Sequence, residues 1–215
     1  MEELLMIELE LKYELNTIPS SVGKLKIIKQ KEQEDIYYDT PNYDLLKKGN
    51  FLRVRDGKRM EFKLFAGDTS HLFCQETVYN LDSFDSNQEN INKILASLDL
   101  KPVENLNSFK QICDINNLQI LCPIVKHRTS YTYDENCTIS IDQVDNLGLF
   151  MEDEIMINSE SLSTLQANQI KEQFVTNLQN SEILTGNEKK VNVGYVELYL
   201  LKHNIEAYNL GMYKI

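Results

Sequence analysis

Acidic and basic side chains alternate with apolar ones near the start of the sequence. The stretch "IELELKY" places Glu8, Glu10 and Lys12 at every second position, with an aliphatic residue between them. Because successive side chains of a β-strand point to opposite faces, this spacing puts the three charged groups on one face. That face is either simply solvated, or it is a site where carboxylates hold a metal ion and the lysine binds an anion.

The same spacing recurs along the chain. The further charged positions are Arg53 and Arg55, Glu61 and Lys63, Lys126 and Arg128, Asp142, and Glu152 and Glu154. Lys and Arg donate charge-assisted hydrogen bonds to phosphate oxygens, and clustered carboxylates hold Mg²⁺ or Mn²⁺, so this combination is typical of a polyphosphate site. The sequence has no G-x-x-x-x-G-K-[ST] loop, so side chains would have to bind the phosphates.

The composition narrows the class of protein. A chain of 215 residues can bury a core without cross-links, and we interpret its four cysteines as reduced thiols. It carries 22 Lys and Arg against 33 Asp and Glu, and the net charge of −11 disfavours nucleic acids and anionic membranes as partners. Glu2 and Glu3 stand where a secretory signal would be basic, and no apolar run is long enough to span a membrane. We therefore predict a cytoplasmic protein.

Several short segments have the alternation and the β-branched or aromatic content of strands. They are IELELKY, EDIYYDT, GNFLRVRDG, RMEFKLF, FCQETVYNL, PIVKHRTSYTY, CTISIDQV and LFMEDEIMI. Closure into a barrel would remove the exposed sheet edges and leave an interior that can hold one small ligand. The sequence therefore predicts a mainly β, α+β fold: a closed eight-stranded antiparallel barrel with peripheral helices.

Helices are expected between and after these strands. Ser20 or Ser21 could cap a helix of about ten residues in "TIPSSVGKLKIIKQ". The segments "SNQENINKILASLDL" and "SLSTLQANQIKEQFVTNLQN" carry apolar residues at roughly helical spacing. No repeat and no Pro/Gly/Ser-rich linker divides the sequence, so we predict one domain over residues 1–215. Its C-terminal helical segment, about 160–215, would pack on the barrel.

The charged stretches also resemble a known family. "ELELK" resembles the ExExK motif of the CYTH superfamily, the triphosphate tunnel metalloenzymes, and "IYYDTPNYDLLKKGNFLRVRDG" resembles its YxDTPxxxLxxxGxxLRxR stretch. "MEFKLF" resembles a later strand with a lysine, "VKHR" a KxR strand, and "ISIDQVDNLGLFMEDE" the segment in which an aspartate precedes a second ExE. These elements follow in family order from Met6 to about Ile157, and "GYVELYLLKHN" is similar to a C-terminal segment of many members.

The resemblance implies an eight-stranded tunnel and a site within it. The implied ligands for Mg²⁺ or Mn²⁺ are Glu8, Glu10, Asp142, Glu152 and Glu154. The implied triphosphate-binding residues are Lys12, Arg53, Arg55, Lys63, Lys126 and Arg128, and the implied catalytic set is Glu8, Glu10, Lys12, Glu152 and Glu154. Asp153 stands where the family commonly has a hydrophobic residue, and we expect it to point away from the site. The roles of Glu61 and Glu76 stay open, between site residue and ion-pair or surface charge.

The family includes class IV adenylate cyclases, thiamine triphosphatases and inorganic triphosphatases. Our main hypothesis is a metal-dependent hydrolase of tripolyphosphate, thiamine triphosphate or ATP, because the chain has the charge constellation but no recognisable adenine-reading motif. The alternative is a class IV adenylate cyclase that forms cyclic AMP and pyrophosphate from ATP, although a His-Phe that family cyclases often carry near the start is absent. A non-catalytic module that binds polyphosphate or nucleotide ranks third. A homodimer is left open.

Overall fold

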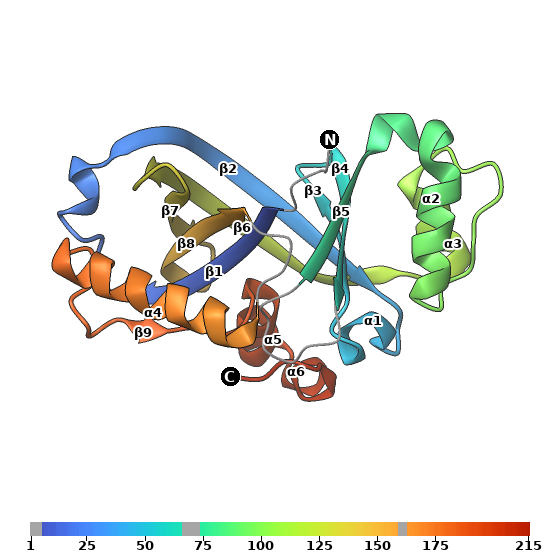
Figure 1. Cartoon of the computed structure of the whole chain (residues 1–215). Helices are drawn as coiled ribbons and strands as arrows, with labels where there is room; N and C mark the ends of the chain where they lie inside the picture. Colours follow the sequence, from blue (N-terminus) through green and yellow to red (C-terminus); the bar gives the residue numbers. More distant parts are fainter. Residues whose placement is uncertain (1–5, 66–73, 159–162) are drawn as a thin grey trace. The chain divides into compact units, whose positions relative to one another are not determined.

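The computed structural model describes residues 6–65, 74–158 and 163–215 (Figure 1). Its strands are β1 (Met6–Leu15), β2 (Lys26–Asp39), β3 (Phe51–Arg55), β4 (Arg59–Phe65), β5 (Cys74–Asn80), β6 (Gln119–Thr132), β7 (Cys137–Val144), β8 (Gly148–Asn158) and β9 (Lys189–Lys190). Its helices are α1 (Asp44–Lys47), α2 (Phe84–Ser97), α3 (Phe109–Asn116), α4 (Thr164–Asn180), α5 (Tyr195–His203) and α6 (Ile205–Leu210). The fold is α+β, as predicted.

The strands form one sheet in the order β5-β4-β3-β2-β6-β7-β8-β1-β9. The neighbours β1 and β8, for example, pair antiparallel along the whole of β1. The order ends at β5 and at β9, so among the described residues the sheet is open, and the predicted closed eight-stranded barrel is not supported. Alternation along a strand determines which side chains share a face, but it does not encode which strands meet at the edges of a sheet.

The chain divides into two compact units, and each is described by itself. Unit 1 comprises Met1–Glu32, Lys126–Asn192 and Ile215, and unit 2 comprises Gln33–Val125 and Val193–Lys214. Strands β2 and β6 each run from one unit into the other. Of the predicted C-terminal helical segment, α4 lies in unit 1, whereas α5 and α6 lie in unit 2. One domain over residues 1–215 stays a prediction.

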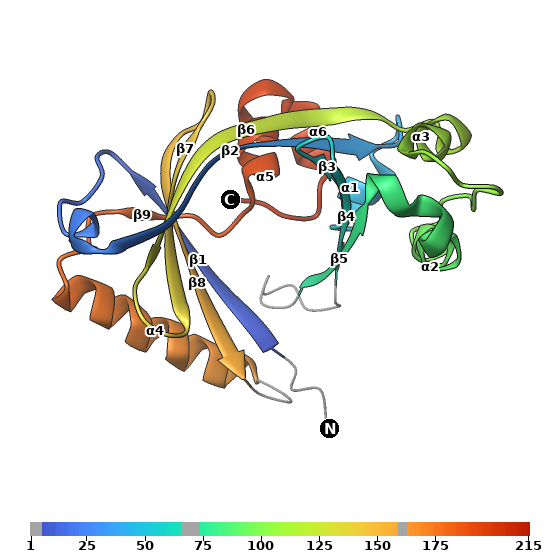
Figure 2. The ribbon, with the colours of Figure 1, turned by 90° about the horizontal axis from the view of Figure 1, so that it is seen from above.

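Unit 1 is built on the pairing of β7, β8 and β1, and α4 lies alongside β1 and β8 (Figure 2). On β1 the aliphatic residues Leu9 and Leu11 are buried at 1% and 2% exposure, so the charged residues between them occupy the opposite face. Helix α4 begins with a capping box between Ser163 and Gln166. It buries apolar residues at helical spacing, among them Phe174.

Unit 2 has a hydrophobic core of its own between its strands and the helices α2 and α3. Leu52 of β3, Phe62 of β4, and Ile91, Leu95 and Ile112 of the two helices are fully buried in it. Because Leu52 lies on the core face of β3, its neighbours in the strand point to the other face. The core therefore fixes the strand that presents the "LRVR" arginines.

The helix predicted in "TIPSSVGKLKIIKQ" is wrong. Only a short 3₁₀ turn, Val22–Lys24, forms there, and β2 begins at Lys26. Ser21 directly precedes this turn but makes no side-chain cap bond to it, and its hydroxyl donates to the Glu182 carbonyl at 2.6 Å. Ile27 and Ile28 are about half exposed and so supply no buried helix face, and their β-branched side chains favour a strand. The eight predicted strands and the two later helices are confirmed, whereas the short elements α1, α3 and β9 were not predicted.

Candidate functional site

Charged side chains of unit 1 gather on adjacent strands, in what we call the carboxylate cluster. It consists of Glu10, Lys12, Lys126, Arg128, Asp142, Glu152 and Glu154. Strand register brings the members together, since Glu10 lies opposite Glu154 and Lys12 opposite Glu152 across β1 and β8. Directly opposed residues on one face of an antiparallel pair are within side-chain reach.

The cations of this cluster are held by its acids. Lys12 Nζ lies 3.1 Å from both Glu10 Oε1 and Glu152 Oε1. Lys126 Nζ lies 2.8 Å from Asp142 Oδ2. Arg128 donates from Nε at 2.7 Å and from Nη2 at 2.6 Å to the two oxygens of Asp142. Arg128 also pairs with Glu152, and its Nη1 lies 3.4 Å from Glu154 Oε1, so it links β6 to β7 and β8.

The four described acids of the cluster differ in exposure. The side chains of Asp142 and Glu152 are 0% and 8% exposed, while those of Glu10 and Glu154 are 39% and 34% exposed. The buried pair therefore acts as fixed counter-charge for the cations. Glu10 and Glu154, which oppose each other in register, are the carboxylates that a ligand from solution can reach.

The pKa shifts follow from this arrangement. Burial by itself raises the pKa of Glu152, but Lys126, Lys12 and Arg128 outweigh it, and the pKa lies well below the ordinary range. Burial by itself lowers the pKa of Lys12, but Glu10 and Glu152 outweigh it and raise the pKa. The pKa of Glu154 is raised, mainly by burial and further by Glu152 and Glu10, against the opposing effect of Arg128. An added cation would therefore favour ionised Glu154.

The donor set of the carboxylate cluster suits a hard divalent cation. Mg²⁺ is commonly held by one or two protein carboxylates while phosphate oxygens and water complete its shell, and Glu10 and Glu154 provide such a pair. No group of three or more His, Cys, Asp or Glu side chains ready to hold a metal occurs in the part of the chain that the structure describes. Glu8 of β1 lies opposite Met156 of β8, but the side chain of Glu8 is outside the described part of the structure.

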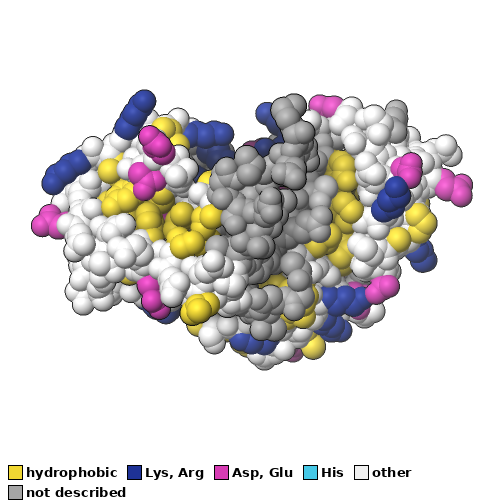
Figure 3. Space-filling view, viewed as in Figure 1, with side chains coloured by type: hydrophobic (Ala, Val, Ile, Leu, Met, Phe, Trp, Pro, Cys, Tyr) yellow, Lys and Arg dark blue, Asp and Glu magenta, His cyan; other side chains and the backbone are white. Residues whose placement is uncertain are grey.

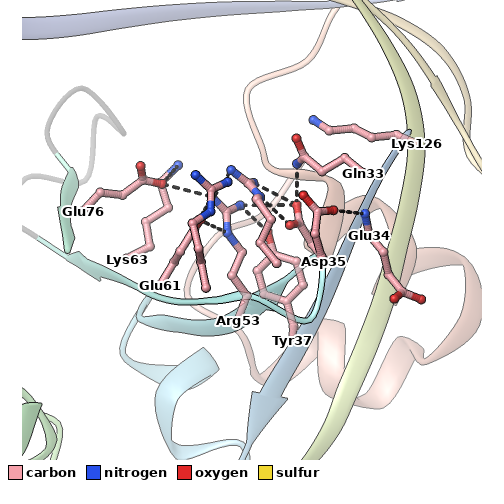
Figure 4. Close-up of polar contacts among 12 residues, drawn as sticks. Gln33, Glu34, Asp35, Tyr37, Arg53, Glu61, Lys63, Glu76 and Lys126 are labelled. Carbon is pink, nitrogen blue, oxygen red and sulfur yellow. Dashed lines mark hydrogen bonds and ion pairs between the residues drawn. The ribbon is translucent and has the colours of Figure 1, made fainter. Parts of the chain in front are cut away.

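A second gathering of charge lies in unit 2, and we call it the arginine cluster (Figure 4). It consists of Arg53, Arg55, Arg59 and Lys63 with Asp35, Glu61 and Glu76. Arg53 of β3 donates from Nε to Glu61 Oε2 at 2.7 Å and from Nη1 to the Tyr37 hydroxyl at 3.0 Å. Arg55 bonds Asp35 through two nitrogens, Nε at 2.6 Å and Nη2 at 2.9 Å. The predicted phosphate-binding arginines are thus paired with buried acids.

The open roles of two glutamates are clarified by their contacts. Glu61 does not pair with Lys63 in the contacts observed; it lies 2.6 Å from Arg53 Nη2 and 3.4 Å from nitrogens of Arg55 and Arg59. Glu76 is partly exposed and lies 3.4 Å from Arg53 and 3.7 Å from Lys63. Both are therefore partners of the cations in unit 2.

Sequence reasoning missed part of the arginine cluster. Gln33, Asp35 and Tyr37 were not singled out, although they occupy one face of β2 at every second position, and Arg59 was also missed. The same period-2 spacing that revealed the other charges could have found the β2 residues. Asp35 is separated from the next acid on that face, Asp39, by Tyr37, so no pair of charges two residues apart drew attention to it.

Asp153 points away from Glu152 and Glu154, as predicted, and is fully buried. It lies opposite Leu11 and Ile139 in register, and neither carboxyl oxygen has a hydrogen-bond partner in the described chain. Burial, reinforced by the charge of Glu152, raises its pKa well above the ordinary value.

The wider surface adds little that is specific. On the face drawn in Figure 3, the described Lys and Arg side chains are scattered among Asp and Glu and do not form one basic patch. None of the helices within the described ranges combines the length and apolar character needed to cross a membrane.

Comparison with known proteins identifies the relatives of this chain. It is 30% identical over 152 residues to the protein named "Putative adenylate cyclase MJ0240" of Methanocaldococcus jannaschii, a match that covers 68% of this chain and 75% of the relative. Among solved structures, the PH1819 protein of Pyrococcus horikoshii OT3 is similar with a TM-score of 0.65 at 22% identity, covering 91% of this chain and 99% of that protein.

A further structure carries a functional description. The Hippeastrum protein HpAC1, described as a putative adenylyl cyclase with a dominant triphosphatase activity, is similar with a TM-score of 0.59 at 14% identity. The similarity covers 94% of this chain and 99% of that protein, and at such identity it shows the fold alone. The model of the CYTH domain matches residues 6–188, which contain both clusters. The chain belongs to the CYTH family, whose members are generally enzymes that act as triphosphatases or adenylate cyclases.

Proposed function

We propose that this protein is a divalent-metal-dependent hydrolase of triphosphates. The observation that carries the proposal is the composition of the carboxylate cluster: the accessible pair Glu10 and Glu154 lies beside Lys12 and Arg128, whose charges are fixed by buried acids. Carboxylates alone would repel a polyphosphate, and cations alone would need no paired acids. Both together fit a phosphate chain that is bound with a metal ion.

Each part of the cluster would have a separate task. Lys12, Lys126 and Arg128 would donate hydrogen bonds to phosphate oxygens. Arg53, Arg55 and Lys63, which belong to the arginine cluster, are further predicted phosphate-binding residues. Glu10 and Glu154 would hold Mg²⁺ or Mn²⁺ directly. The predicted ligand set also includes Glu8, Glu152 and Asp142, of which Glu152 and Asp142 are paired with the cations of the cluster. The metal, when bound, would neutralise charge on the phosphate oxygens.

The reaction we propose is attack by water on the terminal phosphorus. The water oxygen forms the new bond, the bridging P–O bond breaks, and the products are orthophosphate and the shortened chain. The chain's own residues contribute by holding the phosphates in line and by stabilising the charge on the transferring group. The triphosphatase activity described for HpAC1 supports this choice.

A second candidate is a class IV adenylate cyclase. In that reaction the 3′-hydroxyl of ATP replaces water, attacks the α-phosphorus and expels pyrophosphate. The name of the 30% identical Methanocaldococcus jannaschii relative favours this candidate. The two reactions need the same phosphate-binding groups and differ in which oxygen attacks, so the clusters support both.

Product identification distinguishes these functions. The purified protein is incubated separately with tripolyphosphate, thiamine triphosphate and ATP, with Mg²⁺ or Mn²⁺, and all products are identified by ³¹P NMR and chromatography. We expect orthophosphate from at least one substrate. Cyclic AMP and pyrophosphate from ATP would establish the cyclase instead. Binding that raises the melting temperature without any turnover would indicate a non-catalytic module.

A further inference from the structure

We infer that Asp35 is a positioning residue that fixes the guanidinium of Arg55 in the orientation needed to bind phosphate, an inference that rests on the proposed function. Asp35 and Arg55 lie directly opposite each other in the register of β2 and β3. Both bonds between them are short, 2.6 Å from Nε and 2.9 Å from Nη2, so the carboxylate engages one edge of the guanidinium. A bidentate pair fixes the plane of the guanidinium as well as its position.

Asp35 is itself held in place. Gln33, two residues earlier on the same face of β2, donates from Nε2 to Asp35 Oδ2 at 3.0 Å (Figure 4). Asp35 Oδ2 also lies 3.6 Å from Arg53 Nη1. Burial alone would raise the pKa of Asp35, but the bond from Arg55 and the charges of both arginines outweigh it and lower the pKa. The carboxylate therefore stays charged.

Exposure separates the acids from the cations. The side chains of Asp35 and Glu61 are 3% and 4% exposed, whereas those of Arg53 and Arg55 are 13% and 16% exposed. The acids therefore lie deeper than the guanidiniums that they hold. The Asp35 bonds use Nε and Nη2 of Arg55, and Nη1 lies at a looser 3.4 Å from Glu61. That arrangement leaves Nη1 as the nitrogen best placed to donate to an incoming phosphate oxygen.

A purely stabilising role explains the arrangement less well. Replacing a buried ion pair with apolar side chains of similar volume is often neutral or stabilising, so stability alone gives little reason to bury two carboxylates under two arginines. Gln33 adds to the cost, because its carbonyl oxygen is buried and has no hydrogen-bond partner in the described part of the chain. Pre-organisation of Arg55 for an anion accounts for both features.

The test is a double-mutant cycle in the full-length protein. Asp35→Asn, Arg55→Lys and the double variant are compared with wild type for kcat and KM on the triphosphate that the wild type hydrolyses, and for tripolyphosphate affinity by calorimetry. Asp35→Glu is made as well. It keeps the negative charge beside Arg55 but moves it by one methylene, so this variant can still be measured if Asp35→Asn fails to fold. Glu34→Gln is the matched control, because Glu34 is the neighbouring acid on the exposed face of β2 and its carboxylate bonds no described residue.

We expect Asp35→Asn and Asp35→Glu to lower kcat by about tenfold or more, with a smaller change in KM, because a small displacement of a positioning group is costly in the transition state. In the Arg55→Lys background the same changes should cost less than about twofold, since the residue through which Asp35 acts is already altered. Glu34→Gln should behave as wild type.

Two results would overturn the inference while the wild type is active: Asp35 variants with wild-type kcat and KM, or losses that multiply in the double variant. If the wild type hydrolyses none of the triphosphates, the proposed function fails separately. The double-mutant cycle on tripolyphosphate affinity then decides the inference. Losses of binding free energy from Asp35→Asn and Arg55→Lys that do not add in the double variant support it, and losses that add contradict it.

Discussion

At the scale of single residues, exposure divides the acids of the carboxylate cluster into two kinds. Asp142 and Glu152 are buried and act on the lysines and on Arg128, which they hold in place. Glu10 and Glu154 lie on the same face but remain accessible. The sequence does not distinguish these carboxylates, since alternation along a strand shows which face each side chain occupies but not how deeply that side chain is buried. Depth depends on the neighbouring strands.

Removing the charge of an accessible carboxylate should therefore reduce metal-dependent turnover. We expect Glu10→Gln and Glu154→Gln each to lower kcat/KM by at least about tenfold and to raise the metal concentration needed for half activity, because an amide is a poorer ligand for a hard cation. The matched control is Glu14→Gln on the same face of β1, where Glu14 pairs with the exposed Lys189 at 3.2 Å. Activity of the Glu10 or Glu154 variant that equals the control in a metal titration would contradict this assignment.

The buried Asp153 carboxyl leads to a stability prediction. Asp153→Val should raise the free energy of unfolding by about 1–3 kcal/mol, because it removes two unsatisfied oxygens from an apolar face. Asp153→Asn should raise the free energy of unfolding by less, since the asparagine amide would also be buried without hydrogen-bond partners.

The same carboxyl should make stability depend on pH. Its folded-state pKa is raised, so the native protein holds this proton more tightly than the unfolded chain does. Its contribution to stability therefore falls as the pH rises from about 4, the ordinary value, towards the folded-state pKa. Denaturant unfolding at several pH values should show the advantage of Asp153→Val growing over that window; an advantage independent of pH would mean that the carboxyl does not titrate differently in the folded protein.

At the scale of elements, the sequence predicted those strands in which apolar and charged residues alternate over a long enough stretch. The strands around "ELELK", "LRVR" and "MEDE" alternate over several residues, so their type and faces could be read directly. The second half of β2, in "EDIYYDT", was predicted, but its first half was missed, because the side chains on both of its faces are exposed and show no alternation of apolar and polar residues. Helix α1 was missed because four residues are too few for helical periodicity to appear.

Helix α1 is stabilised at its start by the side chain of Asp39, the aspartate of the "DTP" stretch that resembles the family motif. The Asp39 carboxylate accepts hydrogen bonds from the backbone N–H groups of Thr40 at 2.7 Å, Leu45 at 3.0 Å and Leu46 at 2.9 Å. Asp39→Ala leaves these buried donors without their acceptor and should lower the free energy of unfolding by about 1–3 kcal/mol. Asp82→Ala, at an exposed site, is the control in denaturant titrations. Equal stability of the two variants would show that the cap is dispensable.

At the scale of the whole molecule, local charge and total charge oppose each other. The chain carries a net charge of −11, yet all four of its arginines, together with Lys12, Lys63 and Lys126, lie among acidic partners in the two clusters. A polyphosphate would be repelled at long range and attracted only by such clusters, or by a metal ion bound first. The sequence predicted this inventory of charges. It could not predict that the sheet is open, since pairing at its ends depends on contacts distant in the chain.

This opposition predicts that metal and polyphosphate stabilise the protein together more than separately. A ligand that binds only the folded state adds about 2.7 kcal/mol at a hundred times its Kd, which a melting curve detects readily. We expect the increase in melting temperature to be largest with tripolyphosphate plus Mg²⁺ or Mn²⁺, smaller with metal alone, and smallest with tripolyphosphate in EDTA, where the carboxylates face the phosphates without a cation. The Glu10→Gln variant should lose the extra increase, and sodium sulfate at equal ionic strength controls for salt. A full increase in EDTA would show that the phosphates bind through lysines and arginines alone and that no metal is needed for binding.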